Sequence, residues 1–583
     1  MREVTPIAVD APLTVQSDRT ILLEVEHPRA EAARQALASF AELVKSPEHV
    51  HTYRLSSLSL WNAASSGLAP AAVLEELGCL SRYPVPTVVA QFISEQMGRY
   101  GRLRLTAGPD GLELCADSET LLVELKSRGN VRPLLGPRTA HGFLVDPAER
   151  GHLKQVLAHI GWPLADEAGF TPGHPLTLRW REHERSSDAP FSLRGYQRAA
   201  VDAFYGDGRH QAGDGVIVLP CGAGKTLVGI GVMTKVQAHT LILTTSVAAL
   251  HQWRRELLER TTLEPDDIGE YTAAGKVTAP VTLTTYQMLA HRVRGDYPHF
   301  HVMDQGDWGL IIYDEVHLLP APIFRMTAAI QSRRRLGLTA TLLREDGHAE
   351  DVFALIGPKR YDVPWRDMEA AGWIAPALCH EIRVDLPSHL SMVYAAAEDA
   401  DRIRVAAENP AKEGVVAALV EQHRDDHVLI IGQYLDQVEY LGARLQCPVV
   451  TGRTPPRIRE DLYDQFRQGT LKRLVVSKVA NFAIDLPEAN VAIQVSGTFG
   501  SRQEEAQRLG RILRPKAGGG PAYFYTVVTE DTVEQQFAQK RQLFLTEQGY
   551  RYRIAHANEE GLPAERPAAP VIPFPGAGAE GRG

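Results

Sequence analysis

The feature that most constrains this chain is an alternation of short apolar strands with helices, which occurs in two successive sets. In the first set, the predicted strands are 216–219, 240–244, 281–284, 310–313 and 335–338. In the second set, they are 428–431, 449–450, 473–476, 491–495 and 522–528. Strands that are apolar throughout, each followed by a helix, are typical of a parallel sheet covered on both faces. The sequence therefore predicts an α/β protein with two parallel-sheet domains in tandem.

The rest of the chain divides into smaller predicted segments. Residues 1–117 contain helices followed by a hairpin at 103–115, a pattern that indicates a winged-helix-like module. A protein-docking or purely structural domain fits the same pattern. A small α+β domain with a linker is predicted at 118–185, before the sheet domains at 186–365 and 366–557. The tail at 558–583 is rich in Pro, Ala and Gly, and we expect it to be disordered.

Composition excludes several classes of protein. Hydrophobic residues make up 44% of the chain and charged residues 23%, the balance of an ordinary globular protein. We find no apolar run long enough for a membrane span and no secretory signal, and so expect a cytoplasmic protein. The five cysteines lie far apart, which argues against a zinc site or an iron–sulfur cluster. The net charge is -9, so any nucleic acid must be held by a local groove.

A glycine-rich loop at 219–226 follows the first strand of the first set and opens a helix. Glycines let backbone N–H groups turn toward a phosphate, Lys225 supplies a charge to the terminal phosphates, and Thr226 can ligate Mg²⁺. The strict pattern has glycine where Leu219 stands, so an ordinary glycine-rich turn is the alternative interpretation. The predicted nucleotide-binding residues of this loop are Pro220, Gly222, Ala223, Gly224, Lys225 and Thr226.

An acidic pair ends the fourth strand of the first set. Asp314 can hold Mg²⁺, and Glu315 can orient and deprotonate an attacking water. The carboxyl ends of parallel strands are where nucleotide chemistry is found in α/β sheets. The four residues 314–317, which include this pair, could simply cap a strand, but after a phosphate loop they predict the second half of an ATPase site. We therefore expect ATP and Mg²⁺ as cofactors.

These motifs, in this order, resemble those of superfamily 2 helicases and, more narrowly, the XPB-type helicases of DNA repair and transcription. The resemblance rests on the segments 219–226, 314–317, 338–346, 476–479, 484–490 and 503–514. The stretch from 14 to 105 is also similar to the accessory domain of prokaryotic members. The resemblance implies two RecA-like lobes and an ATP-dependent DNA helicase with 3′→5′ polarity that acts in nucleotide-excision repair.

The resemblance also implies roles for further residues at the nucleotide. Gln197, preceded by Arg194, would read the adenine edge, because an amide offers both a donor and an acceptor. Asp485 would contact the ribose. In the second lobe, Arg511 and Arg514 would reach the γ-phosphate bound in the first, where such arginines neutralise developing charge. The residues that would act with them, or couple ATP to movement of DNA, are Gln507, His317, Thr339 and Thr341.

DNA contacts follow from the ends of strands and from one charged triplet. Hydroxyl and amide groups at strand ends can hold phosphate oxygens without reading the sequence. The triplet matches one that marks XPB-type enzymes and is implicated in opening the duplex. The candidates are Thr245, Ser246, Thr285, Gln433 and Lys478 at strand ends, and Arg344, Glu345 and Asp346 in the triplet. Many XPB-type proteins also carry a thumb-like insertion, for which this chain offers only 390–409 as a candidate helix.

Two other functions fit the same sequence. The first is a translocase that remodels branched DNA, or serves a restriction system, without separating strands. The second is an ATP-gated clamp or scaffold that recruits repair partners. We further expect a monomer associated with the nucleoid, with a nuclease as a possible partner.

Overall fold

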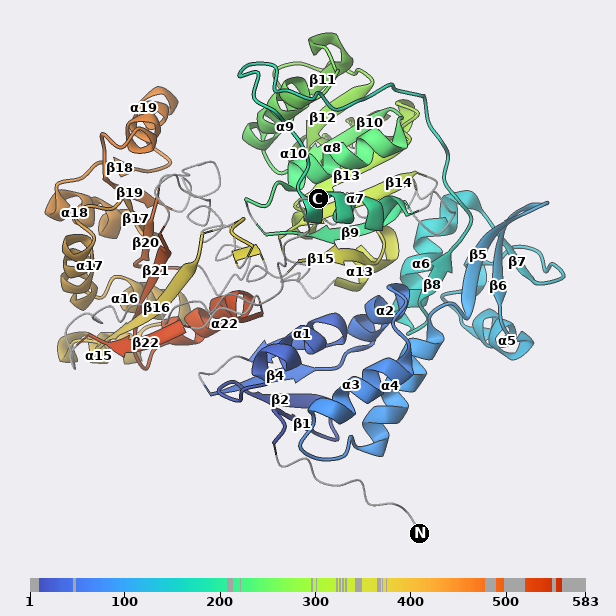
Figure 1. Cartoon of the computed structure of the whole chain (residues 1–583), viewed down its shortest axis with the longest axis horizontal. Coiled ribbons are helices and arrows are strands. Elements are labelled where there is room, and N and C mark those ends of the chain that lie inside the picture. Colours follow the sequence, from blue (N-terminus) through green and yellow to red (C-terminus); the bar gives the residue numbers. More distant parts are fainter. Residues whose placement is uncertain are drawn as a thin grey trace, which may run out of the picture.

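The computed structural model describes residues 10–45, 49–206, 213–220, 222–294, 297–299, 301–320, 323, 327, 330, 333–340, 349–363, 368–369, 371–373, 375–477, 489–497, 520–547 and 552–557. Within these residues, two parallel sheets form the two large bodies in Figure 1, lobe 1 in green and lobe 2 in orange and red. Two smaller sheets with their helices, in blue and cyan, lie beside lobe 1. The predicted fold class, α/β with two tandem parallel-sheet lobes, is confirmed.

Lobe 1 is built on a seven-stranded parallel sheet with the order β11-β12-β10-β13-β14-β9-β15. Its strands are β9 (Asp214–Val218), β10 (Thr240–Thr244), β11 (Ile268–Tyr271), β12 (Val281–Thr285), β13 (Leu310–Asp314), β14 (Arg334–Thr339) and β15 (Lys359–Asp362). Its helices are α7 (Gly195–Tyr205), α8 (Lys225–Val236), α9 (Val247–Arg260), α10 (Tyr286–Ala290), α11 (His301–Gln305) and α13 (Ala349–Leu355).

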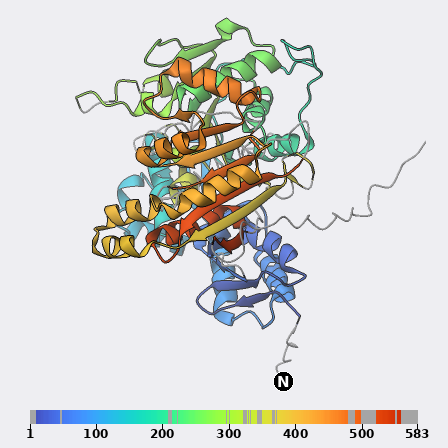
Figure 2. The same cartoon turned by 90° about the vertical axis from the view of Figure 1, so that its left-hand side faces the viewer.

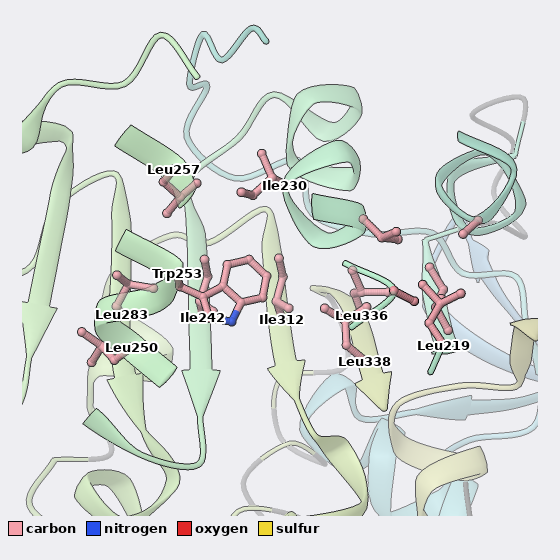
Figure 3. Close-up of a cluster of buried hydrophobic side chains, with 14 of the residues drawn as sticks. Leu219, Ile230, Ile242, Leu250, Trp253, Leu257, Leu283, Ile312, Leu336 and Leu338 are labelled. Carbon is pink, nitrogen blue, oxygen red and sulfur yellow. The ribbon is translucent and has the colours of Figure 1, made fainter. Parts of the chain in front are cut away.

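The strands of lobe 1 are apolar on both faces because both faces are covered. Ile242 and Ile312 belong to one hydrophobic core, and their neighbours Leu241 and Ile311 belong to another on the opposite face. Figure 3 shows the first of these cores, with side chains of the sheet packed under helices α8 and α9. Strand β14 pairs with both β13 and β9, so the loops that follow these three strands meet at one edge of the sheet.

Lobe 2 is a second seven-stranded parallel sheet, with the order β18-β19-β17-β20-β21-β16-β22; Figure 2 shows it from its outer side. Its strands are β16 (Ala377–Val384), β17 (Val428–Gly432), β18 (Val449–Val450), β19 (Arg473–Ser477), β20 (Val491–Gln494), β21 (Ala522–Thr529) and β22 (Tyr552–His556). Its helices are α15 (Ser388–Ala396), α16 (Asp399–Ala407), α17 (Ala411–Gln422), α18 (Leu435–Leu445), α19 (Pro456–Arg467) and α22 (Val533–Glu547).

The region of the candidate thumb holds two short helices, α15 and α16, where the sequence suggested one. The break between them lies at Ala397 and Glu398, whose backbone is extended. Asp399 and Asp401 then follow in the first turn of α16, where acidic side chains favour the start of a helix. Met392 of α15 is 77% exposed, so this helix contributes little to the core.

The first N-terminal module is an antiparallel sheet of order β1-β2-β4-β3 that packs against four helices. Its elements are β1 (Leu13–Val15), β2 (Thr20–Glu24), α1 (Ala30–Phe40), β3 (Glu42–Lys45), β4 (Val50–Arg54), α2 (Ser57–Ser65), α3 (Pro70–Leu80) and α4 (Thr87–Arg99). The second module is a sheet of order β7-β6-β5-β8. Its elements are β5 (Leu103–Gly108), β6 (Gly111–Ala116), α5 (Glu119–Ser127), β7 (Gly142–Val145), α6 (Arg150–His159) and β8 (Leu164–Asp166).

The hairpin at 103–116 forms as predicted, but not as a wing on the first module. Strand β5 pairs with β8, and β6 pairs with β7, so the second sheet crosses the predicted boundary at 117. Gly142 permits this pairing, because a Cβ there would lie 1.8 Å from the carbonyl oxygen of Leu114. The assignment of this hairpin to the first domain was therefore wrong.

The second module is joined to lobe 1 by buried ion pairs. Arg150 donates to Asp166 at 2.6 Å, and Lys154 lies 3.2 Å from Asp166 and 3.9 Å from Asp214, the first residue of β9. Arg335, at the start of β14, is fully buried and lies 3.1 Å from Asp214. Of the pairs named here, Lys154–Asp214 crosses between the module and lobe 1, and Gln155 of α6 also donates to Asp351 of α13 at 3.0 Å, so these contacts join the module to lobe 1.

We expect this ion-pair cluster to make stability depend on pH in acid. Burial by itself would raise the pKa of Asp166, but Lys154 and Arg150 outweigh it and lower the pKa to about 2. Since the folded pKa lies below the unfolded value, the carboxylate contributes fully above pH 3.8 and its contribution is lost as the pH falls toward 2. The expected loss is about 2 kcal/mol.

Chemical unfolding of the parent and of Asp166→Asn at pH 5 and pH 3 measures this contribution. The variant should be less stable at pH 5 and should lose less stability between the two pH values than the parent does. Asp110→Asn, at the exposed tip of the hairpin, is the matched control and should follow the parent. An equal loss in the parent and in Asp166→Asn would contradict the assignment.

Among the described helices, none combines the length and the apolar composition that crossing a bilayer requires.

Candidate active site

The predicted phosphate loop lies where β9 passes into α8. Gly222 and Gly224 have φ angles of 82° and 78°, the left-handed region that glycine adopts without strain. A Cβ at Gly224 would also lie only 2.6 Å from Nε2 of Gln197. Lys225 and Thr226 then open α8, so the loop presents the backbone N–H groups and the positive end of a helix to the same point.

The loop is anchored by the motif that precedes it. Nε2 of Gln197 donates to the carbonyl oxygen of Ala223 at 3.0 Å, while its Oε1 accepts from the backbone N–H of Arg194 at 2.9 Å. The hydroxyl of Tyr196 donates to the same oxygen of Ala223 at 2.7 Å. Gln197 is 2% exposed, so its amide holds the loop in place. Its predicted contact with adenine stays a prediction.

An aromatic side chain from the segment between the lobes packs on this motif. The guanidinium of Arg194 lies 4.6 Å from the ring centroid of Trp373, and the ring of Tyr196 lies 6.2 Å from it. A cation over an indole face is a favourable contact. Trp373 belongs to no motif that the sequence displayed, so only the fold reveals it as a neighbour of the nucleotide loop.

The acidic pair lies beside the lysine of the loop. Nζ of Lys225 is 3.1 Å from Oε1 of Glu315, and both side chains are largely buried. Glu315 has a φ of 50°, a strained conformation for a residue with a side chain, which aims it away from the strand direction. Burial by itself would raise the pKa of Glu315, but the charges of Lys225 and His317 lower it below its usual value. Glu315 is therefore an ionised carboxylate, as a base must be before it accepts a proton.

Asp314 is held from two sides. The indole Nε1 of Trp253 donates to its Oδ2 at 3.0 Å, and the hydroxyl of Tyr286 donates to its backbone carbonyl at 2.8 Å. Burial, followed by the neighbouring charge of Glu315, raises the pKa of Asp314 to about 6. A nearby cation favours the ionised form of a carboxylate. The carboxylate of Asp314 and the hydroxyl of Thr226 are oxygen donors of the kind that Mg²⁺ prefers, so the chemistry of this pair fits the ion.

The predicted coupling residues meet between the acidic pair and the neighbouring strand. Nδ1 of His317 is 2.6 Å from Oγ1 of Thr339 at the end of β14, and 3.5 Å from Oε2 of Glu315. The backbone N–H of Leu219 donates to the carbonyl oxygen of Thr339 at 2.9 Å. A chain of contacts therefore joins the acid pair, Thr339 and the start of the phosphate loop.

The first-lobe DNA candidates cap two helices at the same edge of the sheet. Oγ of Ser246 accepts from the N–H of Ala249 in α9, and Oγ1 of Thr285 accepts from the N–H of Met288 in α10, each at 3.2 Å. Each hydroxyl keeps a hydrogen that it could donate to a phosphate oxygen, but Thr285 is buried in this structure and Ser246 is only partly exposed. Thr245 directly precedes Ser246 and is partly exposed.

The second-lobe candidate Gln433 follows β17, and its backbone N–H donates to Oγ of Ser496 at 2.8 Å.

The remaining predicted site residues lie outside the described residues, and their roles stay predictions. They are Thr341, Arg344, Glu345, Asp346, Lys478, Asp485, Gln507, Arg511 and Arg514.

Three segments of the chain match models of known protein families. Residues 368–566 match the family described as ERCC3/RAD25/XPB C-terminal helicase. Residues 190–344 match Type III restriction enzyme, res subunit, and residues 13–140 match Helicase conserved C-terminal domain. Together the matches cover parts of both lobes, the first N-terminal module and part of the second.

Curated relatives are similar in sequence to this chain over nearly its whole length. The DNA 3'-5' helicase XPB of Kineococcus radiotolerans is 54% identical over 554 residues, which are 94% of this chain and 97% of the relative. The DNA 3'-5' helicase XPB of Mycobacterium tuberculosis is 53% identical over 94% of this chain and 98% of its own. A fission-yeast relative, the general transcription and DNA repair factor IIH helicase/translocase subunit XPB of Schizosaccharomyces pombe, is 31% identical over 92% of this chain and 75% of its own. With the loop, the acid pair and the two parallel sheets described above, these matches show that the chain belongs to the family of XPB-type helicases.

Proposed function

We propose that this chain is an ATP-driven, Mg²⁺-dependent DNA helicase that moves 3′→5′ and opens DNA in nucleotide-excision repair. The observation that carries the proposal is the placement of Lys225, Glu315 and Asp314 at one edge of the lobe 1 sheet, in a chain with a second parallel-sheet lobe. These groups are the ones that phosphoryl transfer to water requires.

In the proposed reaction, the γ-phosphate of ATP and the carboxylate of Glu315 compete for the ammonium of Lys225. A γ-phosphate in the loop would attract the ammonium of Lys225 away from Glu315, which lies 3.1 Å from it. Glu315 would then accept a proton from the attacking water. Bound by Thr226 and Asp314, Mg²⁺ would neutralise charge that develops on the phosphate oxygens. Arg511 and Arg514 would complete this charge stabilisation from lobe 2, so that closing of the lobes depends on ATP.

DNA would lie across both lobes and be held by its backbone. Thr245, Ser246 and Thr285 would hold phosphates on lobe 1, and Gln433 with Lys478 would do so on lobe 2. Closing and reopening of the lobes would then move the strand by a small step. His317 and Thr339 connect the acid pair to the neighbouring strand, which supports their role in coupling hydrolysis to this movement. Within this proposal the protein acts as a monomer at the nucleoid, and a nuclease that cuts opened DNA is the fitting class of partner.

ATPase activity measured against single-stranded, duplex and forked DNA, with RNA as the control, tests the proposal. We expect DNA to raise hydrolysis several-fold and RNA to leave it near the basal rate. A strand-displacement assay beside a triplex-displacement assay then separates a helicase from a duplex translocase, the second function that the fission-yeast relative's name and the restriction-subunit match favour. Hydrolysis that no DNA stimulates would contradict both.

A further inference from the structure

Two aromatic donors connect the DNA-facing helices of lobe 1 to a single residue of the ATPase site. Trp253 belongs to α9, the helix capped by Ser246, and Tyr286 is the first residue of α10, the helix capped by Thr285. The indole N–H of Trp253 reaches Oδ2 of Asp314 at 3.0 Å, and the hydroxyl of Tyr286 reaches the backbone carbonyl of Asp314 at 2.8 Å. The two helices that would hold DNA phosphates therefore hold the carboxylate and the carbonyl of one residue.

The path through Trp253 is short and stiff. Trp253 lies seven residues after Ser246, about 10 Å along a helix. The indole is 1% exposed and lies in the core between α9 and the sheet, with Ile242 and Ile312 around it (Figure 3). A movement of α9 along its axis would carry this ring, and the closely packed core gives the ring little room to absorb the movement.

The same indole also touches the helix that begins at the phosphate loop. A Cβ at Gly229 in α8 would lie 2.4 Å from Cη2 of Trp253, so this position is filled by the indole and accepts only glycine without a shift. Trp253 therefore belongs to α9 and contacts two other parts of the site, the helix that carries Lys225 and Thr226, and Asp314. Packing alone would not require an N–H bond to the one carboxylate that the proposed function assigns to Mg²⁺.

We propose that Trp253 and Tyr286 are positioning residues that transmit DNA binding at α9 and α10 to the carboxylate of Asp314. When DNA contacts the residues that cap these helices, it fixes the positions of the Trp253 N–H and the Tyr286 hydroxyl. These two donors then orient Asp314 toward the cation site. The inference rests on the proposed function, because it takes Ser246 and Thr285 as DNA contacts and Asp314 as a cation ligand. It assigns the DNA dependence of the ATPase site to two residues outside the helicase motifs.

The test uses full-length Trp253→Phe, Tyr286→Phe and the double variant. The main readout is binding: the affinity for a fluorescent, non-hydrolysable ATP analogue, measured in Mg²⁺ with and without forked DNA. We call the ratio of the nucleotide affinities with and without DNA the coupling factor. By linkage, nucleotide changes the affinity for DNA by the same factor, so this ratio measures the coupling between the two sites. In each variant we expect this factor to fall about tenfold or to reach one, as loss of a hydrogen bond to a charged group or its anchor allows. Nucleotide affinity without DNA is measured in the same variants, so that a change in the nucleotide site itself is separated from a change in coupling.

Two matched controls remove similar groups elsewhere in lobe 1. Trp308→Phe deletes a buried indole N–H that donates to the carbonyl of Val302 at 2.8 Å, and Tyr313→Phe deletes a buried hydroxyl 3.0 Å from Oγ1 of Thr327. Both should keep the parent's coupling factor. In EDTA, the difference in coupling factor between the parent and Trp253→Phe should vanish, because no Mg²⁺ is then available for Asp314 to bind. Gly229→Ala should reproduce the loss of coupling by displacing the indole without changing it.

The outcomes separate this inference from the proposed function. If DNA stimulates hydrolysis in the parent but Trp253→Phe and Tyr286→Phe keep its coupling factor, the inference fails and the helicase assignment stands. Equal losses in Trp308→Phe, or a difference that persists in EDTA, would also overturn it. A parent in which DNA changes neither hydrolysis nor nucleotide affinity overturns both. Should Trp253→Phe fail to fold, Tyr286→Phe, which loses only one hydroxyl, still decides.

Discussion

Replacing Lys225 with alanine is expected to lower DNA-stimulated ATP hydrolysis by about 10²–10³-fold or more. Lys225 is the cation at the mouth of the loop, and its partner at 3.1 Å is the proposed base Glu315. In the proposed mechanism, the change would remove the charge that stabilises the transferred phosphoryl group. It also removes the charge that most lowers the pKa of Glu315 against the raising effect of burial. Steady-state hydrolysis with saturating forked DNA measures the effect.

A second lysine of the same helix provides the control. Lys235 in α8 is about half exposed and lies 3.5 Å from Asp202 on the surface. Lys235→Ala should hydrolyse ATP like the parent, and thermal melting should show that both variants are folded. Hydrolysis by Lys225→Ala at the parent's rate would show that the phosphate site lies elsewhere.

Glu315→Gln is expected to lower hydrolysis by about 10²–10⁴-fold while ATP still binds. Glutamine keeps the shape and size of the side chain, but its amide cannot take the proton of the attacking water. Without turnover, the nucleotide should remain in the site, and the closed arrangement of the lobes should persist on DNA. Single-turnover hydrolysis beside nucleotide affinity separates the chemical step from binding.

The carboxylate of Glu270 provides the control for this variant. It lies in lobe 1 near His251 and Arg254, away from the acid pair, so Glu270→Gln should retain activity. A Glu315→Gln protein that turned over ATP at the parent's rate would exclude Glu315 as the base. A variant that no longer bound ATP would instead assign it to nucleotide binding.

The sequence predicted those strands that are mainly apolar. All ten of them form, because strands buried on both faces leave a clear pattern. Strand β16 was missed because the buried polar residues His380 and Glu381 interrupt its apolar run. Glu381 is tolerated there since Arg383 and Gln542 donate to its two oxygens. Strand β15 was missed because it lies at the edge of its sheet and is only partly buried.

The residues of the candidate site also divide into those that a local sequence pattern predicts and those that only the fold brings together. The loop at 219–226 and the acid pair could be predicted because each is a contiguous motif whose spacing follows from its chemistry. Trp253 and Tyr286 could not be predicted, since an aromatic residue on a helix usually indicates core packing. Their hydrogen bonds to Asp314 depend on contacts between segments 28 and 61 residues apart in sequence. Tertiary partners at such separations leave no local pattern, and the same holds for the partners of the hairpin at 103–116.

The buried charges around Asp166 and Asp214 determine how many parts of this molecule move separately. Lys154 of the second module lies 3.9 Å from Asp214 of lobe 1, and Gln155 donates to Asp351 at 3.0 Å, so we expect the second module and lobe 1 to move as one body and lobe 2 as another. Helix α22 of lobe 2 packs against β3 of the first module. A rotation of lobe 2 relative to the first module would therefore have to change the contact between this helix and that strand. Because this seam does not involve the phosphate loop, we expect a bulky substitution between α22 and β3 to restrict movement of lobe 2 without changing the residues around Lys225.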